Sequence, residues 1–446
     1  MNRYQGKKSW LVILLAMVLV FSNGCSLVLL NRANQQENVN QGGEDKEDLA
    51  DNAANGNEGN VGGEESQNTP APTEKPQEPS STNGELITDY MTGKLELLEQ
   101  VINMYYMDEI SVEDLQTGIY KGLLEGLGDP YSCYYTKEEF DDLMESTSGT
   151  YAGIGAVVQQ NLKTMYITVV KPYVDAPAYK AGMLPGDIIY MVDGVDITGM
   201  EVDSVVAMMK GEPGTTVKVT VVRDGVSDPV ELTITRAWIE IETVEYEMLD
   251  NNIGYILVSG FDELTAGQFK DAIKDLKKKG MESLVIDLRD NPGGLLSAVV
   301  EMLDYILPEG MIVYTEDKYG ERQEYKGTNK DVLFLPMVVM INGNSASASE
   351  IFAAAMQDYD AAAILGTTSF GKGIVQSIIP FSDGTAVKVT VSQYFTPRGV
   401  CIHGTGVTPD IEVELDEALL QKVVIEHDED NQLQEAIRHL MEEMKK

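Results

Sequence analysis

The chain has 446 residues, 43% of them hydrophobic, so its length suits two or three domains that each bury a core. Its formal net charge of −39 argues against nucleic acid or an anionic lipid surface as a partner. The three cysteines lie far apart and the three histidines form no His-x-x-x-His pair, so we predict no disulfide framework, no metal site and no cofactor.

The first 30 residues have the pattern of a membrane anchor or signal segment. Basic residues at positions 3–8 precede an apolar stretch over residues 10–30, which a polar break at 22–26 interrupts. Read through the break, the stretch is long enough to span a bilayer with its basic flank in the cytoplasm. Read with the break, it is a signal peptide, and Cys25 after a glycine hints at a bacterial lipoprotein site. Retention at the cell membrane, by a single span or a lipid, is the favoured interpretation, and each alternative places the rest of the chain outside the cytoplasm.

Two segments of contrasting composition come next. Residues 31–85 are rich in Asn, Gln, Gly, Glu and Pro and poor in large apolar side chains. This composition cannot bury enough surface to offset the entropy of ordering, so we predict a disordered acidic linker. Residues 86–148 carry apolar side chains at helical spacing, which predicts a helical N-terminal region, and the run Gly128-Asp129-Pro130 breaks that spacing.

Residues 149–238 have the pattern of a small β-rich domain. The opening run Gly153-Ile154-Gly155-Ala156 precedes a helical stretch at 202–209 and an alternating hairpin entry at 217–225. With residues 181–189 the segment resembles a PDZ domain. The resemblance implies that the opening run presents backbone N–H groups to the C-terminal carboxylate of a peptide that adds as a strand. The alternative is that the two glycines only make a turn.

Residues 239–415 alternate strands with helices. Apolar, β-branched runs at 253–258, 284–288 and 336–341 suit buried strands. Helical stretches between them predict an α/β core. The last segment, residues 416–446, is predicted to be a charged helix.

Ser347 lies between a predicted buried strand and a helix-favouring run. A serine there sits at a helix N-terminus, where free N–H groups favour negative charge. Small neighbours leave room for a substrate backbone, and the Ala348 N–H could point at an oxyanion. The alternative is structural, because Ser347 and Glu350 also fit a capping box.

Lys372 follows Ser347 by 25 residues in an apolar, glycine-flanked run. Burial there would lower its pKa towards neutrality and make it a base, whereas a surface lysine at a turn is the other interpretation. If residues 372–376 form a strand, Gln376 shares a face with Lys372 and its amide could orient the amine.

A third motif, Arg289-Asp290-Asn291-Pro292-Gly293-Gly294, follows a predicted strand and opens a helix. Its glycines allow backbone N–H groups to approach a ligand closely, so Gly293 could supply a second oxyanion donor. By itself the motif is only a strand-to-helix turn.

Together these motifs closely resemble the carboxy-terminal processing peptidases, also called tail-specific proteases. The resemblance runs in order over residues 86–414. The motifs that carry it are Gly128-Asp129-Pro130-Tyr131-Ser132, Gly153-Ile154-Gly155-Ala156, residues 287–294, residues 345–350, Phe370-Gly371-Lys372-Gly373 with Gln376, residues 394–397 and residues 404–410.

The resemblance implies a multidomain α/β fold with a helical N-terminal lead-in, a β-rich PDZ domain and an α/β peptidase core of the crotonase/ClpP-like ββα-spiral kind. It implies that Ser347 is the nucleophile, Lys372 the general base and Gln376 the residue that orients it, with oxyanion donors from Gly293 and Ala348. The choice among the three serines of the motif depends on the family pattern. The implied function is an extracytoplasmic serine endopeptidase whose PDZ domain recognises protein or peptide substrates with nonpolar C-termini.

Two alternative functions remain open. One is a peptide-binding scaffold with a silent peptidase core, and the other is a hydrolase assisted by His403. A signalling role, as in spore-forming relatives, stays open beside processing and degradation. A homodimer, the physiological substrate, and whether the PDZ domain inhibits or activates also stay open.

Overall fold

The computed structural model describes residues 84–330, 332–420, 422 and 425–446. The predicted anchor and almost all of the predicted linker lie outside these residues. Across the described ranges, no helix combines the length and the apolar character that crossing a bilayer requires. The described residues divide into two compact units, residues 84–120 and residues 121–446, and each is described by itself.

The first unit is helical, as its apolar spacing predicts. Helix α2 (Asp89–Tyr105) starts at Thr88, whose side chain accepts a hydrogen bond from the Met91 N–H at 3.2 Å. Helix α3 (Val112–Glu125) follows and runs into the second unit. Neither helix contains a buried residue.

Residues 156–235 form a six-stranded antiparallel β domain with its own core. The sheet order is β3-β4-β5-β7-β8, with β6 paired to β5, so β3 lies at an edge. Fully buried β-branched side chains such as Ile167 and Val219 fill the core, as alternation along the strands requires. The bounds are β3 (Ala156–Gln160), β4 (Ile167–Pro172), α5 (Pro177–Lys180), β5 (Ile188–Val192), β6 (Val195–Asp196), α6 (Val202–Met209), β7 (Thr216–Val222) and β8 (Val230–Thr235).

A two-stranded antiparallel ribbon flanks this domain in the sequence. It pairs β2 (Thr150–Gly153) with β9 (Ala237–Glu240). Helix α4 (Lys137–Ser148) ends at Gly149, directly before the ribbon, in the left-handed conformation that a glycine accepts.

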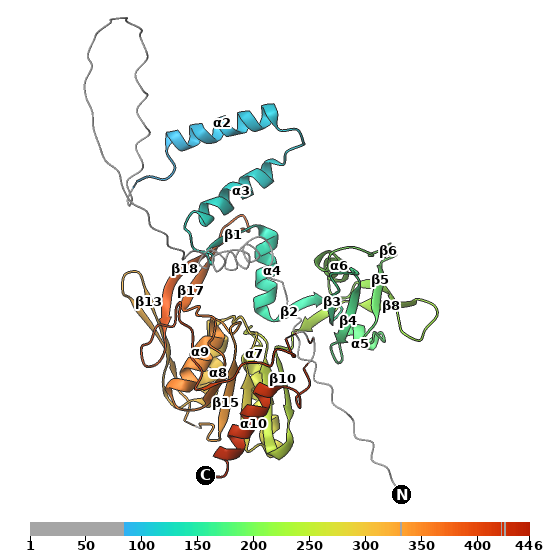
Figure 1. Ribbon diagram of the computed structural model, residues 1–446. Coiled ribbons are helices and arrows are strands. Elements are labelled where there is room, and N and C mark those ends of the chain that lie inside the picture. Colours follow the sequence, from blue (N-terminus) through green and yellow to red (C-terminus); the bar gives the residue numbers. More distant parts are fainter. Residues whose placement is uncertain (1–83, 331, 421, 423–424) are drawn as a thin grey trace, which may run out of the picture. The chain divides into compact units, whose positions relative to one another are not determined.

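The largest core belongs to a six-stranded sheet with the order β10-β11-β12-β15-β16-β19. Only β10 runs antiparallel to its neighbour. Alternate residues face opposite sides: Ile256 and Val339 pack with helices α7, α8 and α9, whereas Tyr255 and Val338 pack with α10 (Figure 1). The bounds are β10 (Val244–Met248), β11 (Ile253–Val258), α7 (Thr265–Lys278), β12 (Ser283–Asp287), α8 (Leu296–Ile306), β15 (Met337–Ile341), α9 (Ala348–Asp358), β16 (Ala363–Gly366), β19 (Ile411–Glu412) and α10 (Asn431–Glu443).

A second sheet of five strands is organised around the long strand β18. Strand β18 pairs antiparallel with β1, β13 and β17, and β14 pairs with β13. Strand β1 comes from far earlier in the chain, so β18 ties residues 133–135 to the core. The bounds are β1 (Cys133–Tyr135), β13 (Gly310–Asp317), β14 (Arg322–Gly327), β17 (Ile374–Pro380) and β18 (Ala386–Phe395).

The parallel strands β12, β15 and β16 end at the same edge of the six-stranded sheet. The three motifs that the sequence singles out follow these ends: residues 289–294 after β12, residues 344–350 after β15 and residues 370–373 after β16. In open α/β sheets this edge is where ligands bind.

Candidate active site at the ends of β12, β15 and β16

Ser347 stands at the N-terminus of α9 in a backbone conformation that few non-glycine residues adopt. Its φ is 55° and its ψ is −113°. Such strain costs energy and persists only where the surrounding structure imposes it. Helix α9 begins at the next residue, Ala348, so the positive end of the helix dipole lies at the serine.

The structure distinguishes the three serines of the motif. Ser345 and Ser349 are completely buried. The Ser345 hydroxyl donates to the Leu288 carbonyl at 2.7 Å, and that of Ser349 donates to the Asn291 carbonyl at 2.9 Å. Ser347 is partly exposed. Two of the serines therefore fasten the motif to the turn after β12, and Ser347 is the one that a substrate can reach.

The carboxylate of Glu350 joins the serine motif to the lysine motif. Its Oε2 accepts the N–H of Ser347 at 2.9 Å and the N–H of Lys372 at 2.8 Å. Its Oε1 accepts the Ser369 hydroxyl at 2.6 Å and the Gly371 N–H at 2.7 Å. The residue is completely buried, so these four donors compensate for the loss of water. The capping pair with Ser347 exists, and the same carboxylate also reaches across to a second loop.

Tyr394 makes a second link between the two motifs. Its hydroxyl lies 3.1 Å from the Ser347 carbonyl and 2.7 Å from the Lys372 carbonyl. Burial raises the pKa of Tyr394 well above its ordinary value, with the charge of Glu350 acting in the same direction. The phenol therefore keeps its proton and stays a donor at neutral pH.

Lys372 lies just before β17 and is partly buried. Burial and then the nearby charge of Lys388 lower its pKa to about 8, although Asp129 and Glu350 act in the opposite direction. A lysine with this pKa carries a free amine in an appreciable fraction of molecules near neutral pH, which a surface lysine does not.

Gln376 lies in β17, whereas Lys372 lies just before that strand, so strand alternation alone does not relate the two side chains. Strand β17 begins only at Ile374, and its pairing with β18 shifts register between Val375 and Gln376. The extra residue of this bulge is Val391 of β18, so the alternation within β17 itself is kept. Within the described ranges the Gln376 Nε2 is buried with no hydrogen-bond partner. A buried amide donor without a partner is costly.

The turn after β12 approaches the serine closely at Gly293. A Cβ atom at Gly293 would lie 2.8 Å from the Ser347 Cβ and 2.9 Å from the Ala348 nitrogen, and its φ of +100° also favours glycine. The Gly293 N–H donates to the Asn291 side-chain oxygen at 2.9 Å. In this conformation the N–H that the sequence suggested as an oxyanion donor is already occupied.

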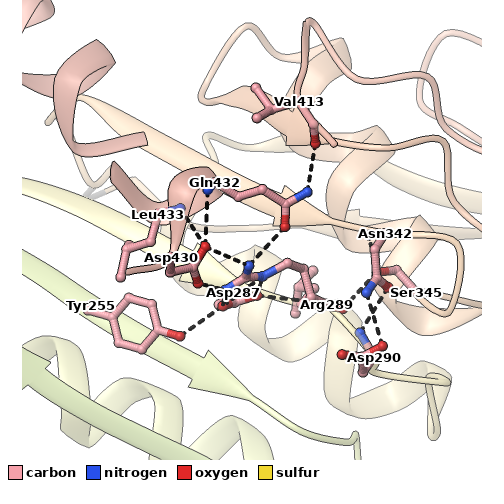
Figure 2. Close-up of polar contacts among 11 residues, drawn as sticks. Tyr255, Asp287, Arg289, Asp290, Asn342, Ser345, Val413, Asp430, Gln432 and Leu433 are labelled. Atoms are coloured by element: carbon pink, nitrogen blue, oxygen red, sulfur yellow. Dashed lines mark hydrogen bonds and ion pairs between the residues drawn. The ribbon is translucent and has the colours of Figure 1, made fainter. Parts of the chain in front are cut away.

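The same turn is anchored on its other side by a buried charge network, which Figure 2 shows. The Arg289 Nη2 contacts Asp287 at 2.6 Å and Asp430 at 2.7 Å, and Tyr255 donates to Asp287 at 2.8 Å. Burial lowers the pKa of Arg289, but the two carboxylates outweigh it and hold the pKa well above its ordinary value. Asp430 is the N-cap of α10, so the C-terminal helix is tied to the strand that carries the Gly293 turn.

The predicted PDZ turn lies between β2 and β3. Gly155 has a φ of +74°, and a Cβ there would lie 2.5 Å from that of Ala176, so only glycine fits. The Tyr151 hydroxyl lies near the N–H groups of Ala156 and Gly155. Burial raises its pKa, and these two N–H groups act in the opposite direction. The N–H groups that the resemblance offers to a peptide carboxylate therefore face a tyrosine of the ribbon.

His403, the histidine of the rival hydrolase, is exposed. Its backbone lies against Gly373, where an added Cβ would come within 2.5 Å of the His403 nitrogen. Among the described residues, no group of three or more His, Cys, Asp and Glu side chains could hold a metal ion.

Sequence reasoning missed three contributors to this site. The sequence offers Glu350 only as a capping partner and as part of a family motif, and Tyr394 only as part of a family motif. Asn291, which occupies the Gly293 N–H, gave no signal of that role. A carboxylate three residues into a helix with an otherwise apolar face is the one sequence signal that could have pointed to Glu350.

The fold is an α/β core with an inserted β-rich domain, and comparison with known proteins identifies both parts. The family model for peptidase family S41 matches residues 252–413, and that for the PDZ domain matches residues 168–223. The chain is 39% identical over 318 residues to the carboxy-terminal processing protease CtpA of Bacillus subtilis, covering 71% of this chain and 67% of that protein. It is 37% identical over 340 residues to the carboxy-terminal-processing protease of Bartonella bacilliformis, covering 75% of this chain and 77% of that protein. Among solved structures, the photosystem II D1 C-terminal processing protease is 29% identical with a TM-score of 0.43, covering 72% of this chain and 86% of that one.

The chain therefore belongs to peptidase family S41 and carries a PDZ domain. The predicted family, the mixed α/β fold class and the enzyme class of a serine-type peptidase are confirmed. The matches span about two thirds to three quarters of the relatives' own lengths.

Proposed function

We propose that the protein is an extracytoplasmic serine endopeptidase in which Ser347 is the nucleophile and Lys372 the general base. The observation that carries this proposal is the Glu350 carboxylate, whose one oxygen accepts the backbone N–H of both residues. A strained, partly exposed serine is thereby held beside a lysine whose pKa is about 8. A serine hydroxyl needs such a base, and a lysine serves only when burial frees its amine.

The chemistry follows from these groups. The Ser347 oxygen attacks the scissile carbonyl carbon while its proton passes to the Lys372 amine. The carbonyl oxygen becomes an oxyanion, which N–H groups at the start of α9, Ala348 first, stabilise. The ammonium then protonates the departing amine of the substrate, leaving an acyl-enzyme. Water then attacks the ester carbonyl of the acyl-enzyme while the Lys372 amine takes a proton from that water. The Lys372 ammonium returns this proton to the Ser347 oxygen as the ester bond breaks.

Two further groups take part once substrate is present. Gly293 supplies the second oxyanion N–H when the turn releases it from Asn291. Gln376, whose buried Nε2 has no partner in the described structure, turns its amide towards the base or the substrate backbone. The close approach of Gly293 to Ser347 supports the first of these assignments.

We assign tail recognition to the PDZ domain. The run Gly153-Ile154-Gly155-Ala156 binds the substrate's C-terminal carboxylate, and the substrate adds along the edge strand β3. Relatives at 37% and 39% identity are named as carboxy-terminal processing proteases, which supports a substrate class defined by its chain end. Nonpolar C-terminal residues are the preferred tails.

The location is part of the proposal. The basic start followed by the apolar stretch over residues 10–30 favours a membrane anchor with the catalytic part outside the cytoplasm. When the layers outside the cytoplasmic membrane are permeabilised, a protease added from outside should degrade the catalytic part of the protein. Protection until the cytoplasmic membrane is lysed would refute this location.

The activity is tested with residues 86–446 and with the full chain in detergent. An unfolded substrate with a nonpolar tail should be cleaved, and Ser347→Ala and Lys372→Ala should each reduce kcat by at least about 1,000-fold. Ser382→Ala and Lys326→Ala change an exposed serine and an exposed lysine of other turns and strands, so they serve as matched controls. Retained cleavage in Lys372→Ala would refute the base. Tight tail binding without any cleavage by the wild-type protein would favour the scaffold.

A further inference from the structure

The run Gly128-Asp129-Pro130-Tyr131-Ser132 has no role in the reaction described so far. It links α3 to β1 and belongs to the same unit as the peptidase core. Within it, the Tyr131 ring lies over the amine of Lys372, with 4.6 Å between the nitrogen and the ring centroid. This distance lies inside the range in which an aromatic face interacts with a lysine.

The turn is held rigidly by its own aspartate. The Asp129 carboxylate accepts the Tyr131 N–H at 3.0 Å and the Ser132 hydroxyl at 2.5 Å. The ring of Pro130, which lies between Asp129 and Tyr131, fixes the φ angle at that residue. Tyr131 therefore leaves the turn in a fixed direction.

The same turn is fastened to the strand beside the base. The Ser132 oxygen accepts the Thr390 N–H of β18 at 3.1 Å, and the next residue begins β1, which pairs with β18. Strand β18 also pairs with β17, where Gln376 lies opposite Thr390. One strand thus fixes both the tyrosine and the chain that follows the lysine.

We propose that Tyr131 is a positioning residue for the base, whose ring covers the Lys372 amine, limits its directions and shields it from water. This inference rests on the proposed function, because it takes Lys372 to be the base. Asp129 and Ser132 act on Lys372 only indirectly, because they orient the Tyr131 ring.

The electrostatics around the amine are compatible with this role. The charged groups that act on it are Lys388 of β18, Asp129 of the turn and Glu350 of α9, and burial is the largest influence. The Tyr131 ring helps to bury the Lys372 amine, which lowers its pKa, and its π face also stabilises the ammonium, which raises its pKa. Removing the ring therefore has two opposing effects on the pKa of Lys372. Burial can shift the pKa of a lysine by several units, whereas interaction with one ring face contributes less. Hydration of the amine is therefore the larger effect, and removing the ring should raise the pKa of Lys372.

The test compares pH profiles of kcat/KM for the wild-type protein, Tyr131→Phe, Tyr131→Ala and Lys372→Ala, because the acid limb reports the base in the free enzyme. Tyr319→Ala is the matched control, since Tyr319 is an exposed tyrosine that also has a lysine over its ring. Tyr131→Phe should keep the rate within about twofold and leave the limb in place. Tyr131→Ala should move the limb to higher pH by about one unit and lower kcat/KM about tenfold at pH 7, with a smaller loss at pH 9. A thermal melt checks that each variant folds.

Several outcomes would overturn the inference. A Tyr131→Ala loss of equal size at every pH would mean only a structural role, and an unchanged profile would mean none. A Tyr131→Phe variant as impaired as Tyr131→Ala would assign the effect to the hydroxyl. Retained activity in Lys372→Ala would instead refute the proposed base, so the two failures are distinguishable.

Discussion

We propose that two turns of this molecule offer backbone N–H groups to a negatively charged oxygen, and a side chain of the protein itself lies against each of them. In the PDZ domain the N–H groups of Gly155 and Ala156 face the Tyr151 hydroxyl. In the peptidase core the Gly293 N–H donates to the Asn291 side chain. Internal acceptors satisfy donors that would otherwise be buried without a partner, and a ligand must displace them.

The two turns differ in where the internal acceptor comes from. Asn291 belongs to the same turn as Gly293, so a small local rearrangement releases the N–H. Tyr151 belongs to β2 of the ribbon that precedes and follows the PDZ domain in the chain. A carboxylate that displaces Tyr151 acts on that ribbon, whereas a substrate carbonyl at Gly293 acts only on its own turn. In the proposed function, tail binding therefore acts on the ribbon, whereas oxyanion binding acts within the Gly293 turn.

After the substitutions at Ser347 and Lys372, the largest effect is expected when the core loses the Glu350 carboxylate. Glu350→Gln places an amide NH₂ among four hydrogen-bond donors, so at least one of them loses its acceptor. We expect kcat/KM to fall at least about 100-fold and the free energy of unfolding to fall by about 2–4 kcal/mol. Steady-state kinetics and denaturant unfolding measure the two changes.

Glu316→Gln is the control for Glu350→Gln, because Glu316 makes an exposed ion pair with Arg322 on the other sheet. The Glu316→Gln variant should keep its free energy of unfolding within about 0.5 kcal/mol of wild type and leave kcat/KM nearly unchanged. Full activity in Glu350→Gln would show that the core does not need this carboxylate and would remove the observation on which the proposed function rests.

Gly293→Ala tests the core turn directly. The new Cβ would lie 2.7 Å from the Ala346 carbonyl oxygen and 2.8 Å from the Ser347 Cβ, so the turn must move. We expect kcat to fall about 100-fold while the Kd for a nonpolar tail stays unchanged, because the PDZ turn is not involved. Gly320→Ala, at an exposed hairpin with open space, controls for a substitution at positive φ. A parallel loss of tail binding would mean that the two turns are not independent.

Tyr151→Phe tests the PDZ turn. Removing the hydroxyl frees the Gly155 and Ala156 N–H groups for a ligand carboxylate, so the Kd for a nonpolar-tailed peptide should decrease about threefold to tenfold. Fluorescence anisotropy of a labelled peptide measures it. Tyr179→Phe, an exposed tyrosine of α5, is the matched control. Weaker binding in Tyr151→Phe would mean that the hydroxyl supports the turn instead of competing for it.

The smallest expected effect concerns stability. The pKa of Lys372 is lowered from 10.5 to about 8 in the folded protein, so the unfolded chain binds more protons between these values. The contribution of Lys372 to stability therefore rises with pH over that window, and the destabilisation is largest below pH 8. Lys372→Met should raise the Tm of the core by a few degrees at pH 7, and the gain should vanish by about pH 11. A gain that does not depend on pH would refute the buried-base assignment.

Local patterns predicted most of the fold. The expected strand at residues 253–258 and the expected helix at 202–209 coincide with β11 and α6. These segments carry strong periodicity or a continuous apolar run, and tertiary packing reinforces both. The shared strand face of Lys372 and Gln376 stays a prediction, because β17 begins at Ile374 and Lys372 lies just before it, where strand alternation sets no direction.

What the sequence determined by itself is the chemistry that depends on neighbours along the chain. It identified a serine before a helix, a lysine in an apolar run and two glycine turns, because capping, burial and positive φ are local demands. Only the tertiary structure decided which serine is reachable and that one carboxylate holds Ser347 and Lys372. Those contacts join segments that are distant in sequence, and their geometry is set by the sheet edges that bring the loops together.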